Sequence, residues 1–158
     1  MKIAIAVLIA CFELQAEDVP KEMIGTWKCD LAKTDWSHKP GGAPREITLM
    51  ITATGWRYDS EGGAGTNTHL VYDSTSRTLT GNNQISMRDE PTGNPFVSDF
   101  RVSLKANGQE VERVIIIGVP GGNSLLVYGS GLSPDGKPWW DRSYFTRADS
   151  SQTRNAPE

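Results

Sequence analysis

The chain has 158 residues, with 16 Lys and Arg against 19 Asp and Glu, so its formal net charge is −3. This length is typical of one domain, which can bury a sizeable core without disulfides. Basic residues are scattered along the chain with no run of them. Because a nucleic-acid partner requires a basic face, composition and charge argue against one.

The first residues have the pattern of an export signal. Lys2 supplies one positive charge, residues 3–12 form an unbroken apolar run, and Leu14 and Ala16 occupy the two positions that a signal peptidase reads. The run is shorter than the roughly 20 residues that span a bilayer. We therefore expect a signal peptide over residues 1–16 and a periplasmic or secreted product. A buried first strand or helix is the alternative.

Two cysteines bear on this processing. The stretch Leu-Ile-Ala-Cys ending at Cys11 resembles the bacterial lipoprotein box, in which the cysteine is lipidated. That alternative gives a membrane-anchored lipoprotein with the same fold. With cleavage after Ala16, Cys29 is the one cysteine left, so no intrachain disulfide is available. We then expect Cys29 to be buried and structural.

Past the leader, strand signals are dense and helical periodicity is nearly absent. Residues 45–54 alternate between apolar and polar side chains, with Ile47, Leu49, Ile51 and Ala53 on one face, as in a half-buried strand. Other segments give strand signals of varying strength, weakest at 84–88: residues 23–31, 56–58, 67–72, 77–80, 84–88, 98–105, 111–119, 124–130 and 138–147.

Short turns separate these segments. Asn107-Gly108 is the strongest hairpin signal, because a two-residue turn of that type places both central residues at φ above zero. The turns leave no room for crossover helices, so we expect all-β structure. Eight or nine sequential antiparallel strands close most readily into a barrel, which removes exposed edges. The prediction is one up-and-down barrel of about eight strands over residues 17–149, followed by a disordered tail at 150–158.

The string Gly25-Thr26-Trp27 opens the first predicted strand. Gly25 permits a tight approach into the strand, and Trp27 is expected to plug one end of the barrel. First and last strands are neighbours in a closed barrel, so an arginine of the last strand is expected over the indole as a cation–π partner. Arg142 and Arg147 are the candidates, and the predicted structural plug consists of Gly25, Trp27 and Arg147.

A family resemblance follows from this opening. The ten residues from Gly25 read Gly-Thr-Trp-Lys-Cys-Asp-Leu-Ala-Lys-Thr. They resemble the start of uncharacterised bacterial exported lipocalin-like proteins, which are calycin-type small β-barrels. The aliphatic residues 125–127 and the hairpin at 131–138 also fit that family. The resemblance covers about 25 residues at the two ends and implies a lipocalin-like barrel, but no established activity.

The opening also looks like that of avidin-type barrels, in which an asparagine and a serine hold the biotin head group. Here Cys29 stands at the asparagine position and Lys33 at the serine position. Neither side chain offers the same hydrogen bonds. We therefore do not expect biotin binding.

Aromatic residues are the candidates for a ligand site. Trp139 and Trp140 are adjacent, so in a strand they point to opposite faces. We predict a pocket at the barrel mouth for a small apolar molecule, with core and surface packing as the alternative for these rings. Its predicted lining combines one face of the last strand with the strand after Gly55: Trp56, Tyr58, Trp140, Arg142 and Tyr144.

Signals for catalysis and metal binding are weak. His38 and His69 are the only histidines, and no His or Cys pair has metal-ligand spacing. Ser130 lacks the Gly-x-Ser-x-Gly context of a nucleophile elbow. We expect no cofactor, no metal and no enzymatic activity. Two alternatives remain: an envelope protein-interaction module with a filled barrel, such as an inhibitor or assembly factor, and a hydrolase or isomerase.

Overall fold

The computed structural model describes residues 19–36, 43–62, 67–133 and 135–148. The predicted signal peptide, Cys11 and the predicted tail lie outside these residues. Within the described part there are ten strands and no helix, so no helix there could cross a membrane. The strands are β1 (Gly25–Cys29), β2 (Glu46–Thr52), β3 (Gly55–Glu61), β4 (Thr68–Asp73), β5 (Thr78–Thr80), β6 (Ile85–Glu90), β7 (Val97–Leu104), β8 (Glu110–Gly118), β9 (Ser124–Leu132) and β10 (Pro138–Arg147).

All ten strands belong to one antiparallel sheet in the order β5-β4-β3-β2-β1-β10-β9-β8-β7-β6. Every strand pairs with its neighbour in the chain except β5 with β6, and β1 pairs with β10. The sheet is therefore an up-and-down barrel that is closed everywhere but between β5 and β6. This confirms the all-β, antiparallel, nearly closed architecture.

The predicted count of about eight strands is wrong, because the structure has ten. The strand signals at residues 77–80 and 84–88 correspond to β5, which has three residues, and β6, which has six. They flank the break in the barrel, where each strand has a ladder partner on one side only. A short edge strand such as β5 is a common way to limit exposed backbone at such a break.

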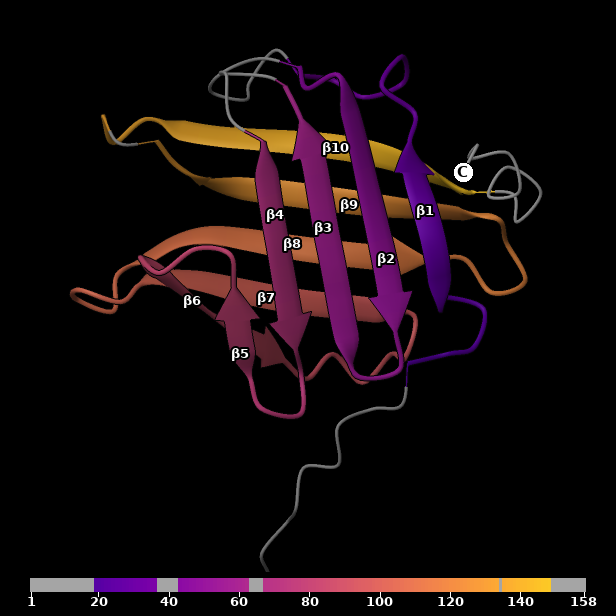
Figure 1. Cartoon of the computed structure of the whole chain (residues 1–158), viewed down its shortest axis with the longest axis horizontal. Helices are drawn as coiled ribbons and strands as arrows, with labels where there is room; N and C mark the ends of the chain where they lie inside the picture. The colour runs from indigo at the N-terminus through magenta and orange to yellow at the C-terminus, as the bar shows by residue number, and fades with distance from the viewer. Residues whose placement is uncertain (1–18, 37–42, 63–66, 134, 149–158) are drawn as a thin grey trace, which may run out of the picture.

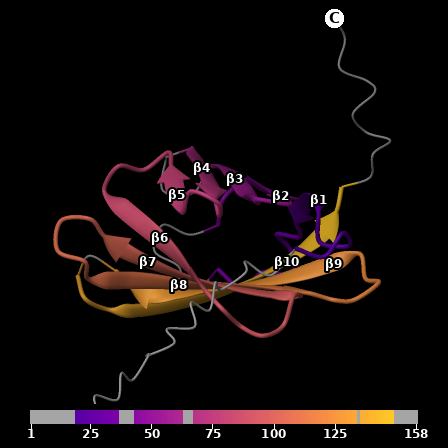
Figure 2. The ribbon, with the colours of Figure 1, turned by 90° about the horizontal axis from the view of Figure 1, so that it is seen from below.

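The barrel is flattened into two layers. Strands β1 to β5 form one layer and β6 to β10 the other, with the strands of the two layers crossing at a steep angle (Figure 1). Seen from below, the layers join along β1 and β10, and β5 approaches β6 on the opposite side (Figure 2). Apolar side chains of both layers point between them and form the core.

Alternation along the strands decides which side chains reach this interior. Ile47, Leu49 and Ile51 of β2 are buried, as predicted. Ala53 is exposed, because β2 ends at Thr52 and Ala53 belongs to the turn before β3. The inward face of β7 likewise carries buried apolar residues, Phe100 and Val102 among them.

The predicted hairpin at Asn107-Gly108 joins β7 to β8, but with a longer connection than two residues. Gly108 adopts φ of +72°, while Asn107 does not have a positive φ. The backbone N–H of Gly108 donates to the Leu104 carbonyl at 2.8 Å, and the N–H of Leu104 donates to the Gln109 carbonyl at 2.9 Å. The left-handed conformation is thus needed at the glycine alone.

Side chains link the two edges of the break. The Tyr72 hydroxyl of β4 donates to Asp89 Oδ1 of β6 at 2.8 Å. Arg77, in the turn between β4 and β5, places its Nε 3.9 Å from the same oxygen. Burial, together with the hydrogen bond to Asp89, raises the pKa of Tyr72, so the hydroxyl keeps its proton. These contacts replace the missing ladder between β5 and β6.

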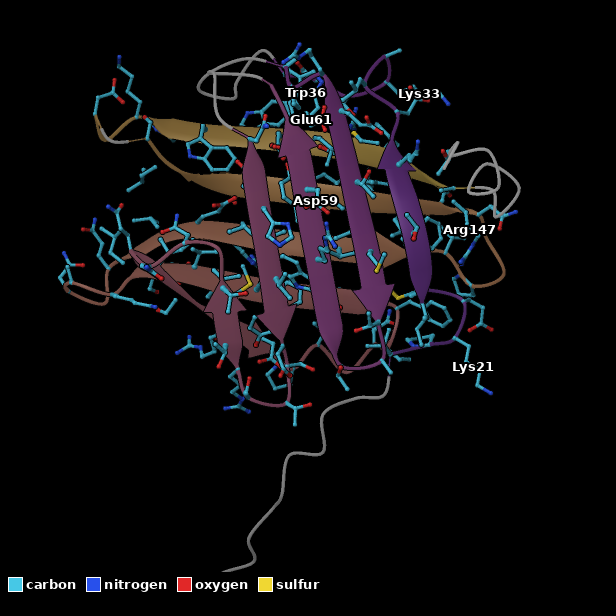
Figure 3. All side chains as sticks on the ribbon, viewed as in Figure 1. Lys21, Lys33, Trp36, Asp59, Glu61 and Arg147 are labelled. Atoms are coloured by element: carbon cyan, nitrogen blue, oxygen red, sulfur yellow. The ribbon has the colours of Figure 1, made fainter. Side chains whose placement is uncertain are left out.

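Trp27 lies at the end of the barrel where β1 begins and β10 ends. It is 1% exposed, and its Nε1–H donates to the Met23 carbonyl at 2.9 Å. Arg147 is its direct neighbour in the β1–β10 register, and the guanidinium carbon lies 4.3 Å from the centre of the indole ring. Figure 3 shows Arg147 beside β1. Of the two candidate arginines, Arg147 therefore makes the cation–π contact. Arg142 lies over Tyr144 instead.

Cys29 is half-buried rather than fully buried, because it closes β1 at the rim of the sheet. Its Sγ lies 3.5 Å from Thr34 Oγ1, in the segment that follows β1. The Thr34 hydroxyl in turn donates to the Asp30 carbonyl at 3.0 Å. The thiol is thus in contact with a structured turn at the edge of the core.

Candidate functional site

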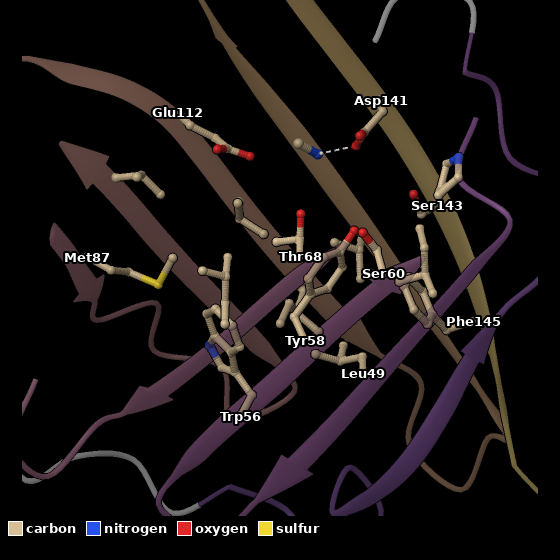
Figure 4. Close-up of a pocket in the computed structure, with 18 of the residues that line it drawn as sticks. Leu49, Trp56, Tyr58, Ser60, Thr68, Met87, Glu112, Asp141, Ser143 and Phe145 are labelled. Atoms are coloured by element: carbon tan, nitrogen blue, oxygen red, sulfur yellow. Dashed lines mark hydrogen bonds between the residues drawn. The ribbon is translucent and has the colours of Figure 1, made fainter. Parts of the chain in front are cut away.

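A cavity of about 350 Å³ lies between the two layers. Its lining comes from the inward faces of β2, β3, β4 and β6 to β10 (Figure 4). Trp27 and Arg147 are not among the lining residues, and Trp139, near the start of β10, is. The cavity therefore lies toward the end of the barrel away from Trp27.

Most of the cavity wall is apolar. Four aromatic side chains contribute to it: Trp56, Tyr58, Trp139 and Phe145. Aliphatic and thioether side chains complete the wall, with Leu49 and Met87 on opposite layers. A wall of this kind excludes water and favours apolar ligand surface.

The ring of Trp56 forms the inner limit of the cavity. It stacks on Tyr72, with centroids 5.8 Å apart, and meets Phe100 edge-to-face at 5.8 Å. Its Nε1 is buried and has no hydrogen-bond partner in the described part of the chain. Such geometry fixes the ring in place through packing on two aromatic neighbours.

Besides the two indole rings, six side chains bring polar groups to the same space. Four carry hydroxyl groups, Tyr58, Ser60, Thr68 and Ser143, and two carry carboxylates, Glu112 and Asp141. No Lys, Arg or His occurs among the described lining residues. A few polar groups in a mainly apolar wall are typical of small-molecule sites, where they orient the ligand.

Asp141 is the most buried of these charged groups, at 4% exposure. Its Oδ1 accepts a hydrogen bond from the backbone N–H of Gly129 at 3.0 Å. A Cβ atom at Gly129 would lie 2.7 Å from that oxygen and 3.3 Å from the Trp139 ring. A glycine at this inward position of β9 therefore leaves the space that the side chains of Asp141 and Trp139 occupy over the strand.

A second cavity, of about 340 Å³, lies toward the other end, between Met23 and the connection from β6 to β7. Trp56 and Ile116 line both cavities and separate them. Five charged residues line the second cavity, Arg77, Arg88, Asp89, Glu90 and Asp99, against two in the first. The first cavity is therefore the better candidate for a mainly apolar ligand.

The predicted ligand residues are divided between the two sides of the barrel wall. Trp56 and Tyr58 line the cavity. Trp140, Arg142 and Tyr144 share one face of β10, but it is the outer face, and Trp140 is 47% exposed. None of these three residues lines this cavity.

The inward residues of β10 are the alternate set, Trp139, Asp141, Ser143 and Phe145. The sequence held a signal for this. If Arg147 points inward to meet Trp27, the period of two along a strand places every second residue before it inward as well.

His69 lines neither of these two cavities and lies on the outer face of the first layer. Its Nδ1 is 2.5 Å from Asp59 Oδ1, and Arg57 Nε donates to Asp59 Oδ2 at 2.7 Å. Partial burial would raise the pKa of Asp59, but the hydrogen bonds from His69 and Arg57 outweigh it and lower that pKa. The described residues contain no group of three His, Cys, Asp or Glu that could hold a metal ion.

Comparisons with protein-family models, with curated proteins and with solved structures find no match to this chain.

Proposed function

We propose that this chain is an exported, lipocalin-like binding protein that holds a small apolar molecule between its two layers and carries out no catalysis. The observation that carries the proposal is the cavity of about 350 Å³ with a mainly apolar and aromatic wall. Sites for small molecules range from about 300 to 1,000 Å³. The leader over residues 1–16 supports a periplasmic or secreted location, with a lipid anchor at Cys11 as the alternative.

The structure supports a site that is formed before the ligand arrives. Trp56 is held by Tyr72 and Phe100, and Asp141 is held by Gly129. A site that needs little rearrangement loses little affinity to ordering its own side chains.

Tryptophan fluorescence tests the proposal. We expect a saturable change in emission when a neutral apolar probe such as 1-decanol is titrated into the protein. Trp139 and Trp140 form a matched pair, because they are adjacent in β10 but face the cavity and the outside, respectively. Trp139→Phe should reduce the change, and Trp140→Phe should leave it. The proposal fails if a panel of neutral apolar probes gives no saturable response, or if the response depends on Trp140 and not on Trp139.

A second candidate function is supported by the outer face of the second layer. Tyr128 and Trp140 are both exposed there, and Tyr128 is the direct cross-strand neighbour of Ile115 and Arg142. Exposed aromatic residues are enriched at protein interfaces. An envelope protein-interaction module would use this face. In that case Trp140→Ser should remove a partner that co-purifies from the native envelope, and Trp139→Phe should not.

A further inference from the structure

Three hydroxyl groups of the first cavity have no hydrogen-bond partner in the described part of the chain. Of the four lining side chains that carry a hydroxyl group, Tyr58 already has an interaction within the protein. Ser60, Thr68 and Ser143 form no side-chain hydrogen bond with any described residue. A hydroxyl group that leaves bulk water without a new partner costs free energy, so buried hydroxyl groups are normally paired. A molecule inside the cavity can supply the partner that these three groups lack.

Ser143 is the most buried of the three, at 5% exposure. It lies on the inward face of β10, between Asp141 and Phe145, which line the cavity as well. Figure 4 shows it on the cavity wall together with Ser60 and Thr68. Its side chain is therefore more than nine-tenths buried, polar and directed between the layers, where a ligand can reach it.

Ser60 and Thr68 form a pair on the first layer. They are direct cross-strand neighbours of β3 and β4, which places their Cβ atoms roughly 5 Å apart on the inward face. Each hydroxyl group can donate one hydrogen bond and accept two. With Ser143 from the second layer, they suit a ligand group that both donates and accepts hydrogen bonds.

The charged side chains of the cavity already have partners. Among the described lining residues these are Asp141 and Glu112, and both take part in interactions within the protein, the hydrogen bond from the Gly129 N–H to Asp141 among them. A charged head group would therefore leave water without a free counter-ion in the cavity. That transfer costs more than the transfer of a neutral group that forms hydrogen bonds. The lining thus favours a neutral head group.

The hydroxyl groups lie away from the apolar inner end of the cavity. Ser60 comes four residues after Trp56 in β3, which at about 3.3 Å per residue corresponds to about 13 Å along the strand. Leu49, the cross-strand neighbour of Tyr58, lines the cavity between these two positions. An extended decyl chain is of similar length and would cover this apolar stretch.

We propose that the ligand of this cavity is an uncharged amphiphile that carries a hydroxyl group. Its hydroxyl group exchanges hydrogen bonds with Ser143 and with the Ser60–Thr68 pair, and its apolar tail extends past Leu49 to Trp56. This inference rests on the proposed binding function and names the ligand class. It separates this barrel from a carrier of fatty acids or of long-chain amines, whose head groups are charged at neutral pH.

Three probes of equal chain length test the head group: 1-decanol, decylammonium and decanoate, each titrated at pH 7 below its micelle concentration with tryptophan emission as the signal. We expect 1-decanol to bind at least about tenfold more tightly than either ion, because only the ions must bury a charge. Equal or tighter binding of decylammonium or decanoate overturns the inference, and the binding function survives. If none of the three binds, the proposed function fails as well.

Variants that remove single hydroxyl groups locate the contact. Ser143→Ala and Thr68→Val should each weaken 1-decanol binding about fivefold, as the loss of one hydrogen bond predicts, and leave 1-chlorodecane binding unchanged in Ser143→Ala. Because these hydroxyl groups have no partner in the described chain, neither variant should lower the urea midpoint of the ligand-free protein. A purely structural hydrogen bond would give the opposite result, a lower midpoint with unchanged binding.

Ser130→Ala is the matched control, because Ser130 is exposed on the outer face of β9 and the change removes the same group. It should leave the affinity for 1-decanol unchanged. A folded Ser143→Ala that binds 1-decanol as tightly as the wild type, or an equal loss of affinity in Ser130→Ala, overturns the inference. If Ser143→Ala does not fold, Thr68→Val decides by the same criterion.

Discussion

Replacing Arg147 with alanine tests how the barrel is closed at the Trp27 end. The guanidinium stacks on Trp27 and donates from Nη1 to the Ile24 carbonyl at 3.0 Å and from Nη2 to the Glu22 carbonyl. One side chain of β10 thereby holds the segment that leads into β1. Without it, the indole loses its cover and two backbone carbonyls lose their donor.

The size of the effect follows from these contacts. A half-exposed cation–π contact contributes about 1 kcal/mol, and each hydrogen bond from a charged donor contributes about 1 kcal/mol after partial solvation. The sum is about 3 kcal/mol, a large part of the roughly 5–15 kcal/mol that stabilises a domain. With a urea slope of about 1.5 kcal/mol/M, the midpoint of unfolding should fall by about 2 M.

Equilibrium urea unfolding measures this shift, and Arg142→Ala is the control. Arg142 is on the same strand but lies outside, 5.3 Å over the Tyr144 ring, so its loss should cost less than about 1 kcal/mol. Equal midpoints for the two variants would refute the reasoning. Gly25→Ala adds an independent check, since a Cβ at this φ of +146° would lie 2.5 Å from Arg147 Nη1. Its cost should be smaller in the Arg147→Ala background, because the clash is then absent.

Two further predictions concern other contacts of the fold. Tyr72→Phe removes the hydrogen bond to Asp89 across the break. It should lower the free energy of unfolding by about 1 kcal/mol and speed amide hydrogen exchange in β5 and β6. Unchanged exchange in these two strands would contradict this role of Tyr72. Asp99 receives two hydrogen bonds from Arg113, at 2.9 and 2.6 Å, which lower its pKa against the opposing effect of burial. Its carboxylate therefore stabilises the fold fully above pH about 4 and loses that effect as the pH falls through the lower folded value. Asp99→Asn should lower the free energy of unfolding by about 1 kcal/mol at pH 7, and the variant should lose less stability than the wild type as the pH falls. If the free energy of unfolding falls in parallel with pH in the two proteins, the stabilising role of the Asp99 carboxylate is contradicted.

Local patterns in the sequence predicted most of the strands. The alternation of Ile47, Leu49 and Ile51 specifies which face of β2 is buried, and Gly108 specifies a turn. The number of strands was harder to predict. β5 has three residues, and its neighbour β6 lies across a break held by side-chain contacts from distant positions, such as Tyr72 with Asp89. Local propensity carries little information about such pairing.

The candidate site was only half predictable. Trp56 and Tyr58 follow a reversal that places them on the inner face of β3, and both line the cavity. For β10, the choice between its two faces depends on register, and a shift of one residue exchanges every side chain between core and solvent. The pairing of Trp27 with Arg147 settles that choice. The role of Asp141 depends further on Gly129, a neighbour on another strand.

Native mass spectrometry of the mature protein from its own host tests the central claim that the space between the layers holds a small molecule. We predict a small-molecule adduct on the wild-type chain. The adduct should be absent from Val127→Phe, which fills the cavity from β9, and present on Trp140→Phe, which changes the outer face. Both variants should have the urea midpoint measured to show that they fold. A bare wild-type chain, or an adduct that persists in folded Val127→Phe, would contradict the claim.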